Sequence, residues 1–185
     1  MNIADETVIP LSKSKLAVLV AGSLLFVAIG VWMMGWSQTE IATVMSFGSP
    51  LVMQIIGAAS LLFFGFCGFI GVKKLFDKRP GLVLNAAGMM DNSSGISAGL
   101  IPWAEITSIE ALQIEQQKLL VVKVQNPEKY VQLGGAMRQA ANQMNMKLCG
   151  SPLVISANSL EINFAELLEI SNAYLAKHRE QLSKA

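Results

Sequence analysis

The side chains of this sequence that could do chemistry are few, and they form no catalytic pattern. The single histidine, His178, lies between Lys177 and Arg179, with no nucleophile or carboxylate at a motif spacing. This setting favours a solvated cation near a helix end over a catalytic base. The sequence contains no phosphate-binding glycine loop, no H-E-x-x-H and no paired C-x-x-C. We therefore expect no enzyme, no catalytic residue, no metal site and no cofactor.

Three carboxylates in the middle of the chain, Asp91, Glu105 and Glu110, are the remaining candidates for acid–base chemistry. Two of them would have to lie together to act as a general acid and base. Turn and strand-surface roles are the simpler interpretation, since Asp91 precedes an Asn-Ser-Ser-Gly run that is typical of a tight turn. Cys67 and Cys149 have no metal-motif spacing and are expected to be small buried hydrophobes.

Five residues are candidates for contact with a partner or with the membrane surface. Four are basic and follow a long apolar run, namely Lys73, Lys74, Lys78 and Arg79. They fit the role of topology determinants, and they could also hold a domain against anionic lipid at ~1 kcal/mol per cation. The fifth is Trp103, which belongs either to the core or rim of a domain or to an exposed aromatic anchor.

The distribution of charged residues along the chain reveals two long uncharged segments. No Asp, Glu, Lys or Arg occurs in residues 16–39 or 41–72. Residues 16–36 and 51–72 are each long enough, at 1.5 Å per residue, to cross a bilayer core of ~30 Å. We predict a transmembrane hairpin over 16–72, with helices at 16–36 and 51–72 and a short loop at 37–50. Residues 1–15 form an N-terminal segment, 73–80 a basic linker and 81–185 a separate domain.

Orientation follows from the basic residues beside the two runs. Lys13 and Lys15 precede the first run, the four basic residues named above follow the second, and residues 37–50 contain no Lys or Arg. The positive-inside rule places both termini in the cytoplasm and the loop outside. From Lys73 onward, 12 Lys and Arg stand against 10 Asp and Glu, with no basic stripe, so we expect no nucleic-acid partner.

The second run is rich in small residues, including Gly57, Gly65, Gly68 and Gly71. Small residues let helix backbones approach closely. We expect them to pack on the first helix through its own small residues, which are Ala17, Ala21, Gly22 and Ala28. Packing between copies, giving a homo-oligomer through this Gly-rich helix, is the alternative. Neither run holds an ionisable side chain, which argues against a transporter.

Residues 81–185 read as an α+β domain. Short strands are predicted near 82–85, 89–91, 106–112, 118–124, 153–156 and 160–162. Helical patterns are predicted at 127–133, at 137–148 and over a C-terminal helix that begins after Asn163. Asn163 with Glu166 resembles a capping box, and Phe164, Leu167, Leu168, Tyr174 and Leu175 form its apolar stripe.

Short strands followed by one amphipathic helix, behind a two-helix anchor, resemble the bacterial pleckstrin-homology-like (PH-like) membrane proteins. The segments GMMDNSSGISAGLIPWAEI, NPEKY and GSPLVIS…LEINFAEL resemble more closely a group of uncharacterised bacterial inner-membrane proteins with two transmembrane helices. The resemblance implies a small split β-barrel of two sheets closed by the C-terminal helix. Inositol-phosphate-binding relatives carry a basic first hairpin. This chain has no Lys or Arg between Arg79 and Lys118, which argues against headgroup binding there.

These observations lead to a functional expectation. We expect a membrane-anchored, non-catalytic binding module, displaying a PH-like domain to a protein partner at the inner face of the bacterial cytoplasmic membrane. The alternatives are a lipid-binding or bilayer-sensing protein and an accessory subunit of a larger membrane complex. The expected partners are the lipid bilayer and an unidentified protein.

Overall fold

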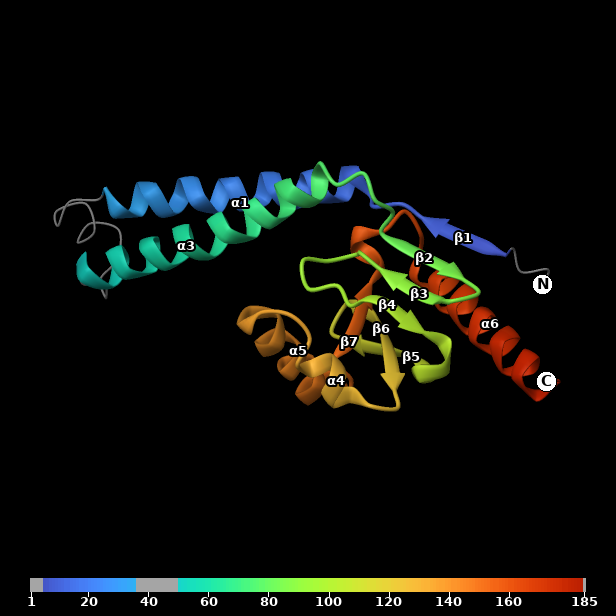
Figure 1. Ribbon diagram of the computed structural model, residues 1–185. Coiled ribbons are helices and arrows are strands. Elements are labelled where there is room, and N and C mark those ends of the chain that lie inside the picture. Colours follow the sequence, from blue (N-terminus) through green and yellow to red (C-terminus); the bar gives the residue numbers. More distant parts are fainter. Residues whose placement is uncertain (1–4, 36–49, 185) are drawn as a thin grey trace. The chain divides into compact units, whose positions relative to one another are not determined.

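The computed structural model describes residues 5–35 and 50–184, which form two compact units (Figure 1). One unit is helical and covers Lys13–Asp77. The other combines Met1–Ser12 with Lys78–Ala185. The predicted loop at 37–50 and residue 36, the predicted end of the first helix, lie outside the described residues, apart from Pro50, where a helix begins.

The helical unit consists of α1 (Lys13–Met34) and α3 (Pro50–Leu75), packed along each other. Both helices are long and apolar enough to cross a membrane, with mean hydropathies of 2.5 and 2.2. Their large apolar side chains are mostly exposed, which suggests a membrane protein with two spans. At the base of the hairpin, Lys13 Nζ donates to the carbonyls of Leu75 (2.8 Å) and Asp77 (2.5 Å), so the lysine caps the end of α3.

Glycine contacts explain how closely the two helices approach. A Cβ on Gly30 would lie 2.9 Å from the Gly57 carbonyl oxygen, and the reverse distance is also 2.9 Å. Gly68 likewise faces Ser23, whose Oγ would lie 2.7 Å from an added Cβ. Small residues of the second helix therefore do pack on the first, as predicted. At these contacts the residues on α1 are Gly30 and Ser23, outside the predicted set.

Open space remains at two other glycines of the hairpin. A Cβ at Gly22 or at Gly65 would meet nothing within 4 Å. The predicted contact through Gly22 is therefore wrong for this hairpin, because no neighbouring atom reaches it. Packing between copies through the Gly-rich helix stays a prediction.

The first sheet of the second unit has the antiparallel order β1-β2-β3-β4. Its strands are β1 (Glu6–Ile9), β2 (Leu82–Asn85), β3 (Gly88–Asp91) and β4 (Gly99–Pro102). Strand β1 precedes the helical hairpin and β2 follows it, yet the two are paired from Glu6↔Asn85 to Ile9↔Leu82. The hairpin is thus inserted between neighbouring strands of one sheet. A domain boundary at residue 81 leaves out its first strand.

The second sheet has the antiparallel order β5-β6-β7. Its strands are β5 (Ile106–Ile114), β6 (Gln117–Val124) and β7 (Leu153–Ser156), with α4 (Pro127–Val131) and α5 (Ala136–Cys149) between β6 and β7. The strand predicted at 160–162 is absent. Leu160 makes only an isolated bridge to Leu11, because it follows a 3-10 turn, Ala157–Ser159, that breaks the extended chain.

The C-terminal helix α6 (Phe164–Ser183) packs on strands of both sheets. The predicted cap is confirmed: Asn163 Oδ1 accepts from the Glu166 amide at 2.9 Å, and its Nδ2 donates to the Glu166 carboxylate at 3.2 Å. Leu167, Tyr174 and Leu175 are buried, whereas Leu168 is only half-buried. The fold is α+β. Among the described strands no ladder joins the two sheets into a closed barrel.

Candidate functional site

The four predicted basic residues are divided between the two units. Lys73 and Lys74 lie in the last turn of α3, where Lys74 Nζ is 3.9 Å from the Asp77 carboxylate. Lys78 and Arg79 begin the sheet-containing unit, and both are exposed. Arg79 lines a cavity of the sheet-containing unit.

Trp103 is a core residue, 2% exposed. Its indole Nε1 donates to the Asn85 carbonyl at 2.7 Å, and its ring stacks on Tyr174 with centroids 5.9 Å apart. The Tyr174 hydroxyl is in turn 2.8 Å from Thr7 Oγ1 on β1. The exposed-anchor interpretation of Trp103 is therefore wrong, since the indole ties the first sheet to α6.

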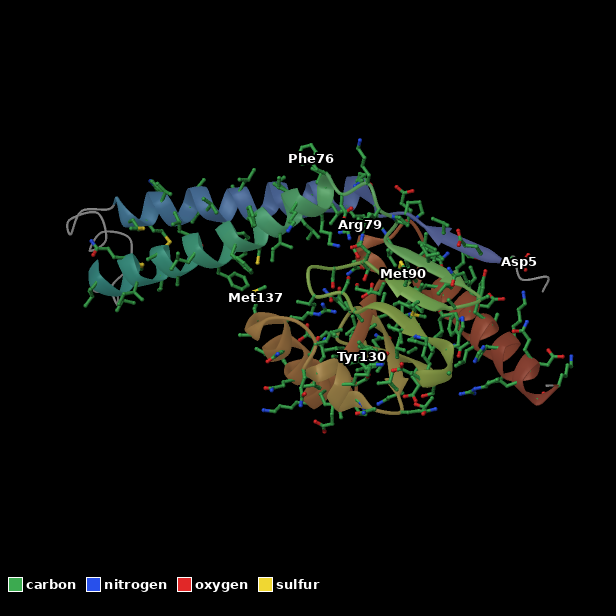
Figure 2. All side chains as sticks on the ribbon, viewed as in Figure 1. Asp5, Phe76, Arg79, Met90, Tyr130 and Met137 are labelled. Atoms are coloured by element: carbon green, nitrogen blue, oxygen red, sulfur yellow. The ribbon has the colours of Figure 1, made fainter. Side chains whose placement is uncertain are left out.

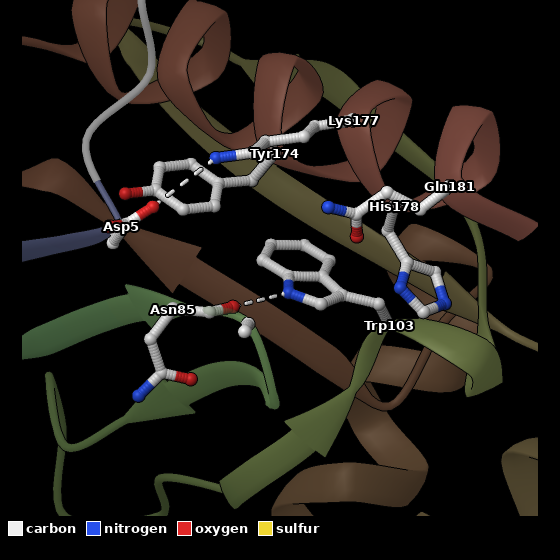
Figure 3. A pocket seen from close by; sticks show the side chains of 8 residues that line it. Asp5, Asn85, Trp103, Tyr174, Lys177, His178 and Gln181 are labelled. Carbon is white, nitrogen blue, oxygen red and sulfur yellow. Dashed lines mark hydrogen bonds and ion pairs between the residues drawn. The ribbon is translucent and has the colours of Figure 1, made fainter.

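A small cavity of about 160 Å³ lies beside this stack (Figure 3). Its polar side chains come from α6, from β2 and from the residue before β1, namely Asp5, Asn85, Lys177, His178 and Gln181. His178 is half-buried and its buried Nε2 has no hydrogen-bond partner, so its side chain is not on the fully solvated face that the sequence predicts. Ligand pockets usually measure roughly 300–1,000 Å³. At about 160 Å³, this cavity lies below that range.

A larger cavity of about 330 Å³ lies between the β3–β4 loop, residues 92–98, and the start of α5. Two arginines, Arg79 and Arg138, are among the residues that line it. Arg138 donates through Nη2 to the Ser97 carbonyl, and its Nε is buried without a partner. The site thus combines two cations and an unused donor with a volume inside the range of ligand pockets.

Asp91 also lines this cavity, but its oxygens organise the loop. Oδ1 accepts from the amide (2.9 Å) and hydroxyl (2.6 Å) of Ser93, and Oδ2 from the Ala98 amide (3.1 Å). This is the turn role expected from the sequence. Sequence reasoning missed Arg138, which lies 59 residues beyond Arg79 on another element. The available signal was that α5 carries two basic residues and no acidic one.

Glu105 forms a structural lock with α4. Its carboxylate accepts from Lys129 Nζ at 2.7 and 2.8 Å and from the Tyr130 hydroxyl at 2.9 Å. The hydrogen bond from Lys129, with that from Tyr130, lowers the pKa of Glu105. Burial and the neighbouring carboxylate raise the pKa of Tyr130. The lock thus joins two segments that are distant in sequence, IPWAEI and NPEKY.

The three carboxylates have separate structural roles, so the alternative of an acid pair is not supported. Glu105 belongs to the lock, Asp91 to the loop, and Glu110 accepts from Ser108 Oγ at 2.6 Å on β5. Among the residues with a described structure, no three metal-binding side chains come together. No protein-family model, curated protein or solved structure matches the chain.

Proposed function

We propose that this chain is a membrane-anchored, non-catalytic binding module that displays a PH-like domain at the inner face of the bacterial cytoplasmic membrane. The observation that carries the proposal is the insertion of the hairpin between β1 and β2. Three residues separate β1 from α1, and six separate α3 from β2. A sheet held by two short connections stays at the membrane surface, where it can present its remaining edges.

Strand β5 is the edge that best fits a protein partner. It is the longest strand, with nine residues, and among the described strands it pairs only with β6. Arg179 of α6 covers one end by donating to the Thr107 carbonyl at 2.5 Å. From Glu110 onward, most side chains of β5 are exposed. An extended peptide adds to such an edge through main-chain hydrogen bonds.

Site-specific photo-crosslinking in intact membranes tests the β5 edge. A photoreactive residue replaces Ala111 on β5 or, as a matched control, the exposed Ala165 on α6. We expect a discrete protein adduct from position 111 and none from position 165. Equal adducts from both positions, or none from position 111, would contradict the proposal.

Lipid binding is a second candidate function, supported by the two-arginine cavity. Arginine pairs bind phosphate oxygens through charge-assisted, often bidentate hydrogen bonds. The argument against headgroup binding was the missing basic residue between Arg79 and Lys118, and Arg138 supplies a cation from a different element. The rest of the cavity wall includes Met90 and Val83, which fit the glycerol or acyl part of a phospholipid.

Native mass spectrometry of the full chain released from nanodiscs containing phosphatidylglycerol tests this second function. We expect Arg79→Gln to reduce the bound phosphatidylglycerol, while Lys118→Gln, an exposed cation on β6, leaves it unchanged. Equal lipid retention in both variants would remove the cavity from consideration.

A further inference from the structure

Helix α5 is amphipathic, but it turns its polar side toward the domain and its apolar side outward, which is the reverse of a helix on the surface of a soluble domain. Asn142 is 3% exposed, and its Nδ2 donates to the Tyr130 carbonyl at 2.7 Å. Other polar side chains of α5 also bond carbonyls of the domain, namely Arg138 to Ser97, Gln139 to Gln132 and Gly134, and Asn145 to Pro152. The polar side of the helix is therefore the inward side.

The apolar side of α5 faces outward. Met137 is 53% exposed, Met144 61% and Leu148 66%. Figure 2 labels Met137 on this helix. These positions recur at helical spacing and share one face. Leu133, just before the helix, and Met146 are also exposed. We name the three residues Met137, Met144 and Leu148 the α5 face. Apolar side chains gathered on one outward face indicate that something other than water covers them.

The charge of α5 indicates what covers its face. The helix contains Arg138 and Lys147 and no Asp or Glu. At its C-terminal end, Lys123 Nζ donates to the Gly150 carbonyl at 3.0 Å, adding another cation. Apolar residues with basic and no acidic side chains are typical of helices that lie in the interface of an anionic bilayer.

A second apolar surface borders the same cavity as α5. On the outer side of the first sheet, one cross-strand row runs from Val8 through Val83 and Met90 to Leu100, with three of its four residues exposed. Val83 and Met90 line the cavity that Arg138 closes from the α5 side.

The short connections to the helical hairpin explain why a bilayer is close to the α5 face. The domain joins α1 after Ser12 and follows α3 from Lys78. A membrane-spanning hairpin keeps the domain beside the leaflet, so binding to that leaflet is effectively intramolecular. We propose that the α5 face inserts into the boundary between headgroups and acyl chains of the leaflet that anchors the chain. This surface is separate from the β5 edge.

Spin labelling of the full chain tests the proposal. A label replaces Met144, or the exposed Ala165 on α6 as control, in a chain whose Cys67 and Cys149 are changed to Ala. The chain is reconstituted at one copy per nanodisc of phosphatidylethanolamine and phosphatidylglycerol. We expect the label at 144 to collide with oxygen several-fold more than with a water-soluble nickel complex, and the label at 165 to show the reverse.

Two further results decide the matter. The double change Met137→Glu and Leu148→Glu is made in a chain labelled at the exposed Ala140. Compared with the same label in the parent chain, access of the nickel complex should rise, while circular dichroism reports an unchanged fold. A label at 144 as accessible to nickel as the label at 165 would overturn the proposal. If the label at 144 were protected from nickel only in discs that hold two chains, a second copy would cover the α5 face. That result would also overturn the proposal.

Discussion

Helices α5 and α6 have similar sequence patterns, but their apolar faces point in opposite directions. That of α6 faces the core, and that of α5 faces outward. Both carry apolar side chains at helical spacing, and both end near charged residues. Helix α6 buries its stripe, including Leu167 and Tyr174, against strands of the two sheets. Helix α5 turns Met144 outward and buries Asn142. Periodicity thus identifies a helix and its apolar face, but it does not say whether that face meets the core.

The largest expected effect is on the α6 side. Leu167 is 0% exposed, and replacing a buried leucine by alanine costs ~2–5 kcal/mol. Leu167→Ala should therefore strongly lower the free energy of unfolding, whereas Met144→Ala should stay within ~0.5 kcal/mol, as is typical of surface changes. Urea unfolding of the full chain in detergent, followed by Trp103 fluorescence with Trp32 and Trp36 changed to Phe, measures both. Similar losses in the two variants would remove the distinction between the helices.

The sequence predicts both Leu167 and Leu168 against the sheet, and only Leu167 is fully buried. The cap at Asn163 was predictable because it depends on residues three apart. Strand β1 was not, since four residues before a membrane helix give no pattern until their partner, β2, is placed beside them. The position of Arg138 at the cavity could not be predicted for the same reason, because its neighbours there are distant in sequence.

Buried polar groups give the next comparison. Asn142→Ala removes a hydrogen bond to a main-chain carbonyl and should cost about 1 kcal/mol. Ser171, on α6, is 0% exposed and its Oγ has no partner, so Ser171→Ala should be neutral or stabilising. The same urea experiment compares them. Destabilisation by Ser171→Ala equal to that by Asn142→Ala would mean that α6 also depends on polar contacts.

A smaller effect is expected at the lock that supports α4 and α5. Because the folded pKa of Glu105 lies below its unfolded value, its ionisation stabilises the fold above the unfolded pKa of about 4.5, and this contribution is lost as the pH falls through the folded pKa. The carboxylate is partly exposed, so Glu105→Gln should cost at most ~1 kcal/mol at pH 7.

Hydrogen exchange locates the effect of the lock. In Glu105→Gln, amide protection should fall in α4 and α5 and stay unchanged in α6. The difference from the parent chain should shrink as the pH falls below about 4.5 and through the folded pKa of Glu105. Loss of protection across α6 as well would show that the two helices unfold together, and a difference independent of pH would exclude the carboxylate charge as the cause.

The central claim is that the domain is anchored at the cytoplasmic face by a hairpin that spans the membrane. A reporter enzyme that is active only outside the cytoplasm tests it directly, fused after Ala185 or inserted at Thr43, which lies outside the described residues. The basic flanks, Lys13 and Lys15 before α1 and Lys73 and Lys74 at the end of α3, predict an inactive fusion after Ala185 and an active one at Thr43. The reverse pattern would place the domain outside the cytoplasm, and activity at neither or at both positions would contradict a two-span hairpin.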